Sequence, residues 1–231
     1  MKTENEEKQA EEVSEAGSDA RSARIFSCRF SIVNLLLFFA IAGFGLFADL
    51  ATKEWAFSAL GMPGEYRWQE EPELHGVYWV WENVIGFQTS LNEGALFGMG
   101  QGRSDLFAFL SIIALIGIIG WILHSAWKSR FLVIIFGLIV AGILGNLYDR
   151  LGRHGLQWNY ETDLHRIGEP VCAVRDWILV MIGSWPWPNF NLADSMLVCG
   201  ACLLVLHSFL VSDEEPSDLK EKIHKTERPS R

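Results

Sequence analysis

The sequence predicts an all-α membrane protein with four transmembrane helices and a few short strands beside them. Half of the 231 residues are hydrophobic, and the charged residues gather in tails and loops, which leaves four long stretches with almost no charge. A stretch of roughly 20 mostly apolar residues is long enough to cross the hydrocarbon core of a bilayer. Between residues 76 and 97, β-branched and aromatic residues alternate with Asn and Gly turns, which favours short strands.

The chain divides into two polar tails and an apolar core. Residues 1–29 form an acidic tail that is poor in aromatic residues, so we expect it to be disordered. The first span is too long for the apolar region of a cleaved signal peptide. The core covers residues 30–211, and a second tail covers residues 212–231. Within the core we expect spans at about 30–48, 106–127, 131–147 and 190–211, with outer loops at 49–105 and 150–189.

The basic residues predict the orientation of the spans. With both tails in the cytoplasm, twelve of the nineteen Lys and Arg residues lie inside, including Lys128 and Arg130 in the short turn between the second and third spans. This split agrees with the excess of Lys and Arg in the cytoplasmic loops of membrane proteins. The net charge of −9 argues against nucleic acid as a partner, because phosphate binding needs a basic face.

Polar residues gather at the outer ends of the spans in this topology. Asn146, Asp149 and Arg150 are spaced i, i+3, i+4 at the end of the third span, and Asn191 and Asp194 are spaced i, i+3 at the start of the fourth. Residues at these spacings share a helix face. A four-helix bundle would bring them together with the end of the first span, and ionisable residues within membrane spans are candidates for function.

Other interpretations of these residues stay open at this point. Each polar residue, taken singly, could be a solvated helix cap, and Asp194 could serve the dipole of its own helix. Carboxylates within spans also mark ion pathways, so the alternative function is a small transporter or channel subunit with a carboxylate site at the outer leaflet. A transporter should carry polar residues at mid-membrane and internal repeats, whereas these spans are apolar at their centres. A third possibility is a structural assembly factor.

Five short motifs resemble those of one bacterial family, the lipoprotein signal peptidases (signal peptidase II), and stand in the same order. They are DLATK (49–53), NEGALF (92–97), GNLYDR (145–150), VRDWI (174–178) and FNLADS (190–195). The resemblance implies an aspartic endopeptidase of the inner membrane that removes the signal peptide from diacylglyceryl-modified prolipoproteins and cuts before the lipidated cysteine. It also implies a small β-sheet cradle on the outer (periplasmic) face.

The resemblance assigns roles to individual residues, which we state as expectations. The catalytic pair would be Asp176 and Asp194. Asn92, Asn146, Arg150 and Asn191 would hold the substrate, and the supporting residues would be Asp49, Lys53, Gly94, Phe97 and Asp149. The partners would be prolipoproteins and membrane lipids, the active site would lie at the outer leaflet, and the protein would be a monomer. No cofactor is implied, and the scattered histidines lack metal-ligand spacing.

Two features depart from the family pattern. The loop at residues 151–175 is longer than the few residues expected between the third and fourth motifs, and Arg175 stands where an apolar residue is usual. The long loop makes Asp163 a rival to Asp176 for the place beside Asp194. We expect Asp176, because the apolar residues that follow it can dock against the bundle, whereas Asp163 lies in a polar run. On an extended strand Arg175 would point away from Asp176.

Overall fold

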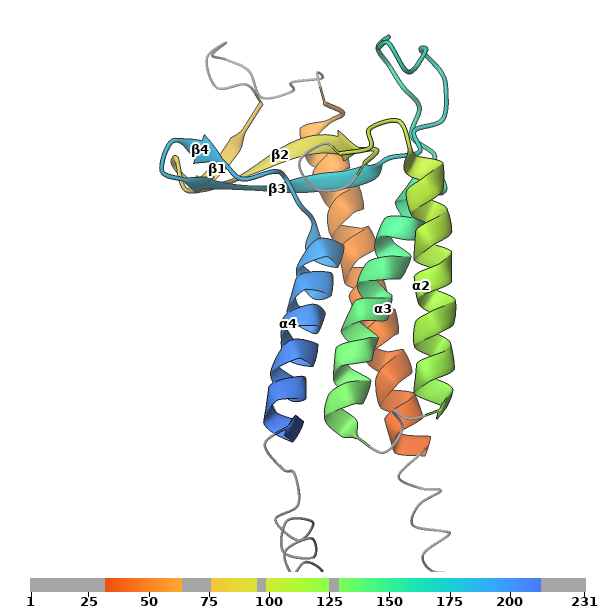
Figure 1. Ribbon diagram of the computed structural model, residues 1–231. Coiled ribbons are helices and arrows are strands. Elements are labelled where there is room, and N and C mark those ends of the chain that lie inside the picture. Colours follow the sequence, from red (N-terminus) through yellow and green to blue (C-terminus); the bar gives the residue numbers. More distant parts are fainter. Residues whose placement is uncertain (1–31, 64–75, 95–98, 125–128, 213–231) are drawn as a thin grey trace, which may run out of the picture.

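Four long apolar helices form a bundle, and each is long enough to cross a membrane (Figure 1). The computed structural model describes residues 32–63, 76–94, 99–124 and 129–212. Phe97 and both expected tails, apart from Ser212, lie outside the described residues. The helices found there are the first helix (Ile32–Leu60), α2 (Ser104–His124), α3 (Arg130–Arg150) and α4 (Leu192–Ser212). A helix of 21 residues is about 31 Å long, which matches the hydrocarbon core of a bilayer.

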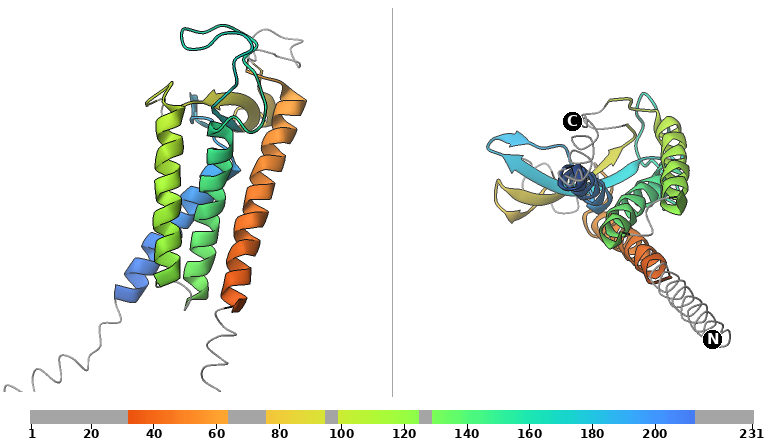
Figure 2. Two further views of the ribbon diagram at one scale, coloured as in Figure 1. Left: turned by 90° about the vertical axis from the view of Figure 1, so that its right-hand side faces the viewer. Right: turned by 60° about the horizontal axis from the view of Figure 1, so that its bottom comes forward.

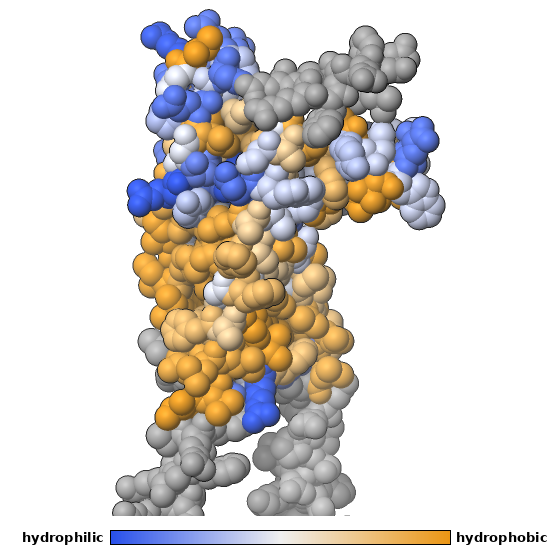
Figure 3. Space-filling view, turned by 180° about the vertical axis from the view of Figure 1, so that it is seen from behind, coloured by the Kyte–Doolittle hydropathy of each residue, from blue (hydrophilic) through white to orange (hydrophobic). Residues whose placement is uncertain are grey.

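The outward faces of the helices are apolar, as a lipid environment requires. Phe44, Ile116 and Phe209 each leave more than 60% of their surface exposed. On the face that Figure 3 shows, hydrophobic side chains cover the helices, and hydrophilic ones gather at one end of the molecule. By contrast, α3 is largely buried between its neighbours. The expectation of a four-helix membrane protein is therefore confirmed.

The first helix is longer than expected. We expected the span to end near Ala48, but the helix continues through Asp49 and Lys53 to Leu60. Both charged side chains are fully buried and form an ion pair at i, i+4. Because each of these two charges has a partner inside the protein, Asp49 and Lys53 do not end the first helix.

A four-stranded antiparallel sheet lies across one end of the bundle (Figures 1 and 2), which we call the sheet end. Its strands, in spatial order, are β1 (Tyr78–Trp81), β2 (Ile85–Asn92), β3 (Val174–Ile182) and β4 (Trp185–Pro186). The first two strands fall in the segment where the sequence predicts short strands. The short strand β4 pairs with the end of β3.

The helices alternate in direction, so Leu60, Ser104, Arg150 and Leu192 all lie at the sheet end, and Ile32 and Ser212 lie at the other (Figures 1 and 2). Two glycines of α3 let α4 and the first helix approach it closely. A Cβ on Gly142 would lie 2.5 Å from the carbonyl oxygen of Ala193, and one on Gly145 would overlap the carboxylate of Asp49. This close approach brings the polar end of α3 against the first turn of α4.

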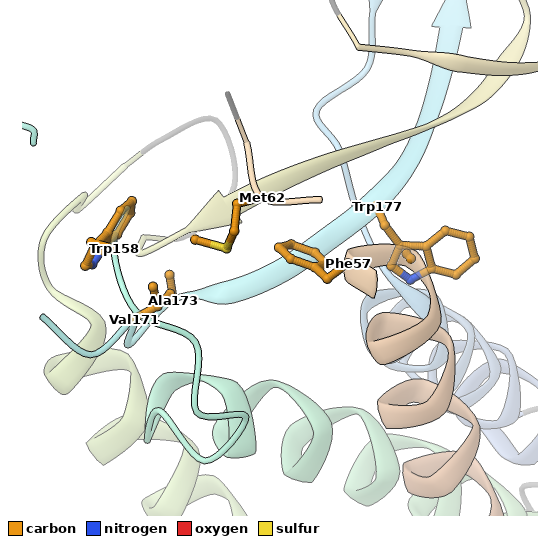
Figure 4. Close-up of a cluster of buried hydrophobic side chains, with 7 residues drawn as sticks. Phe57, Met62, Trp158, Val171, Ala173 and Trp177 are labelled. Atoms are coloured by element: carbon orange, nitrogen blue, oxygen red, sulfur yellow. The ribbon is translucent and has the colours of Figure 1, made fainter. Parts of the chain in front are cut away.

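A hydrophobic cluster fastens the sheet and the long loop to the first helix. Trp177 from β3 packs with Phe57 and Met62 at the end of the first helix, and Trp158 and Val171 come from the loop (Figure 4). Within the loop, residues 157–170 form a hairpin whose base is an antiparallel bridge between Gln157 and Pro170. We call this unit the 157–170 hairpin.

Candidate active site

Asp176 and Asp194 lie in the wall of one cavity at the sheet end. The cavity has a volume of about 960 Å³, and Asn92, Asn146 and Arg150 also line it. Asp176 comes from β3 and is 2% exposed, whereas Asp194 lies in the first turn of α4 and is half-buried. The fold thus brings together residues from β2, α3, β3 and α4 that are up to 102 positions apart in the sequence.

A capping box at the start of α4 places Asp194. The side-chain oxygen of Asn191 accepts a hydrogen bond from the backbone N–H of Asp194 at 2.9 Å, and Oδ2 of Asp194 accepts one from the backbone N–H of Asn191 at 3.2 Å. This reciprocal pair satisfies two N–H groups that a helix start leaves free. The i, i+3 spacing of Asn191 and Asp194 therefore has a local structural cause. Asp194 lines the cavity, whereas Asn191 is fully buried and does not line it.

The side chain of Asn191 joins the two carboxylates. Its Nδ2 donates to Oδ1 of Asp176 at 2.6 Å while its oxygen caps the helix that carries Asp194. Asn92 is a second donor to Asp176, and the strand register places it there. Ser90 pairs with Asp176, so Asn92, two residues along β2, lies diagonally opposite Asp176 on the same face of the sheet. Nδ2 of Asn92 lies 3.3 Å from Oδ2 of Asp176.

Asn146 has its orientation fixed by a buried cation. Nζ of Lys53 donates to Oδ1 of Asn146 at 3.0 Å. An ammonium group has no acceptor, so the amide oxygen must face Lys53. The amide nitrogen then faces Asp194 and donates to its Oδ1 at 2.7 Å. The same oxygen of Asn146 also accepts from Nδ2 of Asn191 at 3.2 Å, so Lys53 determines how both amides meet the carboxylates.

The supporting residues form a buried charge network beside the cavity. Lys53 lies between Asp49 at 2.7 Å and Asp149 at 3.1 Å. Asp149 also accepts hydrogen bonds from the backbone N–H and the guanidinium of Arg175, each at 3.0 Å. The other oxygen of Asp49 accepts from the backbone N–H of Ala193 at 2.8 Å. The network thus connects the first helix, α3, β3 and the start of α4.

Two residues of this network have contacts that the sequence did not indicate. Asp149 contacts Lys53 and also Arg175, which lies on β3. Arg175 appeared in the sequence only as a departure from the family pattern. It is 2% exposed and also contacts Glu54 at 3.2 Å, so it is a structural ion-pair partner that faces away from the cavity.

Arg150 is held at the mouth of the cavity by two contacts. Its Nη2 donates to the carbonyl oxygen of Gly94 at 3.2 Å, and its guanidinium lies 5.5 Å from the ring centre of Phe107. Its Nε is buried and has no hydrogen-bond partner among the described residues. The face of α3 that carries Asn146 and Arg150 therefore lines the cavity.

The electrostatic surroundings of Asp176 favour its protonated form. Burial raises the pKa of Asp176 well above its usual range, and the nearby charge of Asp194 raises it further. The amides of Asn191 and Asn92 and the charge of Lys53 act in the opposite direction, and their effects are smaller. Two carboxylates in one water-poor site hold a proton between them more readily than they both ionise.

Other residues of the cavity carried no signal in the sequence. Gln101 and Asn189 line it from loops. Asn189 donates to the backbone oxygen of Gln88 at 2.7 Å, which fastens the segment before α4 to β2. Asp163, the rival of Asp176, is exposed on the 157–170 hairpin and does not line the cavity. In the described part of the chain, no group of three or more His, Cys, Asp or Glu residues could hold a metal ion.

Comparison with known proteins gives consistent matches. Residues 41–210 match the family described as signal peptidase (SPase) II. The chain is similar to the lipoprotein signal peptidase of Rhodopirellula baltica, with 40% identity over 178 residues that cover 75% of this chain and 71% of that protein. It is also similar to the lipoprotein signal peptidase of Rhodococcus jostii, with 32% identity over 193 residues, 82% of this chain and 80% of that one.

Two solved structures share the fold, and both are described as bacterial membrane enzymes studied by the in meso method. The first has a TM-score of 0.60 and 23% identity, covering 78% of this chain and 92% of the other. The second has a TM-score of 0.55 and 24% identity, covering 74% of this chain and 90% of the other.

Proposed function

The chain belongs to the signal peptidase II family, and on this premise we propose that it removes signal peptides from prolipoproteins by aspartic chemistry, with Asp176 and Asp194 as the catalytic pair. The observation that carries the proposal is the bridge made by Asn191, whose side chain binds Asp176 and caps the helix turn of Asp194 in the wall of one cavity. The transporter and assembly-factor alternatives have no comparable support.

The two carboxylates have different surroundings and so suit different roles. Asp176 is buried and holds a proton, so it polarises the scissile carbonyl. Asp194 receives a hydrogen bond from Nδ2 of Asn146 and lies at a helix N-terminus, and both features stabilise a negative charge. Asp194 is therefore the base that takes a proton from the attacking water.

Hydrolysis then proceeds by transfer of protons between these groups. The water oxygen bonds to the carbonyl carbon, its proton passes to Asp194, and the carbonyl oxygen takes up the proton of Asp176. When the C–N bond breaks, the leaving nitrogen receives the proton from Asp194 and the carbonyl oxygen returns its proton to Asp176. The pair thus ends the cycle with one proton, as it began.

The other cavity residues bind and position the substrate. The guanidinium of Arg150 and the amide of Asn92 are donors for backbone carbonyl groups of the signal peptide. Ile143, Leu197 and Val198 extend the cavity wall along the apolar parts of α3 and α4, where lipid chains of a modified cysteine find an apolar surface. We place the sheet end at the outer leaflet and both tails in the cytoplasm, in keeping with the distribution of basic residues.

The direct test is cleavage of a diacylglyceryl-modified prolipoprotein by the purified full chain in lipid. Asp176→Asn and Asp194→Asn should each lower kcat by about 10²- to 10⁴-fold, because each removes one proton-transfer group. Asp163→Asn is the matched control and should keep near-normal activity. The unmodified precursor should be a poor substrate. Full activity of either Asp176→Asn or Asp194→Asn would refute the assignment. Loss of activity in Asp163→Asn would favour Asp163 over Asp176 as the partner of Asp194.

A further inference from the structure

The 157–170 hairpin lies within the loop that is longer than the family pattern, and it has hydrogen bonds of its own. Trp158 and Glu169 are joined by a backbone hydrogen bond of 2.9 Å, and Gly168 donates to the carbonyl oxygen of Trp158 at 2.7 Å. At the tip, the backbone N–H of Thr162 donates to the carbonyl oxygen of His165. Trp158 is 5% exposed in the hydrophobic cluster that joins the sheet, the loop and the first helix (Figure 4), so the base of the hairpin is fixed to the protein.

The hairpin contacts the end of β2 through His165. The imidazole ring stacks on Trp158, with ring centres 4.5 Å apart and planes 6° from parallel. Its Nε2 lies against Oε1 of Glu93, and the contact is an ion pair when the imidazole is protonated. The side chain of Glu93 is 9% exposed, and Glu169 on the hairpin is the other carboxylate that faces His165, at 3.8 Å.

A second contact reaches the turn before α2. A Cβ on Gly102, which has a φ of +75°, would lie 3.3 Å from Cδ1 of Leu164, so this leucine packs directly on the backbone there. His165 and Leu164 are neighbours at the tip of the hairpin. The hairpin therefore contacts both Glu93, in the stretch Asn92–Gly94, and Gly102, in the stretch Gln101–Arg103.

These two stretches form one wall of the cavity. Asn92, Gly94 and Gln101 line it, and the carbonyl oxygen of Gly94 receives the hydrogen bond of Arg150. The backbone N–H of Gly94 donates to Oδ1 of Asn92 at 3.0 Å, which turns Nδ2 of Asn92 toward Asp176. Glu93 lies between Asn92 and Gly94 in the chain, so its position is coupled to theirs.

We propose that the 157–170 hairpin holds this wall of the cavity in place and that His165 is a positioning residue for prolipoprotein binding, acting through Glu93. The proposal rests on the proposed function of the cavity. Without His165, the buried carboxylate of Glu93 loses this partner, and the wall relaxes to expose that carboxylate to water. The hairpin thereby tunes substrate affinity from outside the cavity.

Two substitutions at His165 separate stacking from the charged contact. His165→Phe keeps an aromatic ring on Trp158 but loses the contact with Glu93. His165→Arg keeps a cation that can stack on an indole and bind a carboxylate. Asp163→Asn, exposed on the same hairpin, is the matched control. Each full-length variant is assayed for kcat and KM on the lipidated prolipoprotein, and amide hydrogen exchange is followed without substrate.

We expect His165→Phe to raise KM by about 3- to 10-fold with kcat changed by less than about 2-fold, the pattern of lost ground-state binding. His165→Arg should restore KM, and Asp163→Asn should match the natural chain. Exchange at the amides of Gly94 and Arg103 should become faster in His165→Phe alone, because both amides are hydrogen-bonded within the wall that the hairpin holds.

An unchanged KM and unchanged exchange in His165→Phe would overturn the proposal, as would a fall in kcat at constant KM. Failure of the proposed function is a different result, because then the natural chain would not cleave the substrate or Asp194→Asn would still do so. The exchange measurement needs no catalysis, so it tests the contact between the hairpin and the wall in either case.

Discussion

Replacing Asn191 by serine separates the two roles of this side chain, which caps α4 and also donates a hydrogen bond to Asp176. Serine and asparagine are comparably good N-cap residues, so the hydroxyl can still accept from the backbone N–H of Asp194. Serine has no group that can replace Nδ2, which donates to Oδ1 of Asp176 at 2.6 Å and to Oδ1 of Asn146 at 3.2 Å. The substitution therefore keeps the helix start and removes the bridge between the catalytic carboxylates.

The size of the effect follows from these two hydrogen bonds. A hydrogen bond contributes about 0.5–1.5 kcal/mol net, and one to a charged group contributes more, so the loss of both is worth about 1–3 kcal/mol. If this free energy stabilises the arrangement needed in the transition state, kcat/KM falls by about 5- to 150-fold, since each 1.36 kcal/mol is tenfold in rate. The same two buried hydrogen bonds stabilise the folded protein, so the free energy of unfolding should also fall, by up to about 3 kcal/mol.

The assay compares kcat/KM for a lipidated prolipoprotein with thermal unfolding of the same preparations. Asp163→Asn, at an exposed position outside the cavity, is the control and should leave both quantities unaltered. If Asn191→Ser kept full activity, the bridge would have no part in catalysis. If the loss of activity were fully explained by unfolding at the assay temperature, the bridge would again have no separate part in catalysis.

Two further predictions concern pH and topology. Because burial and the charge of Asp194 raise the pKa of Asp176, the pair keeps its proton to higher pH than an ordinary aspartate, and kcat should fall as pH rises through that raised pKa. The same shift favours the protonated folded state, so the stability from Asp176 is present at low pH and is lost as pH rises through the folded pKa. Asp176→Asn, which resembles the protonated form, should abolish this loss in pH-dependent thermal unfolding. For topology, reporter fusions at Arg231 and within residues 152–170 should lie on opposite sides of the membrane, and identical readouts would refute the four-span arrangement.

The sequence alone was sufficient to predict interactions between residues that lie close together in the chain. The four helices follow from the length of each apolar stretch, because the lipid core alone requires a helix of about that length. The i, i+3 spacing of Asn191 and Asp194 forms a capping box within one helix turn, and the spacing of Asn146 and Arg150 places both on the face that lines the cavity.

The tertiary structure decided which distant groups meet. Asp176 reaches Asn191 because β3 pairs with β2 and docks over the bundle, a register that the composition of the 151–175 loop does not reveal. Asp49 and Lys53 were expected as the end of a span, and only the approach of Asp149 and Ala193 shows why both charges can be buried.

The 157–170 hairpin depends on tertiary contacts in the same way. His165 meets Glu93, 72 positions earlier in the chain, only because Trp158 fixes the base of the hairpin. Hydropathy and helix spacing are properties of short segments and can be read along the chain. Contacts between segments depend on how the helices and the sheet dock, and their free energy appears only once both partners are in place.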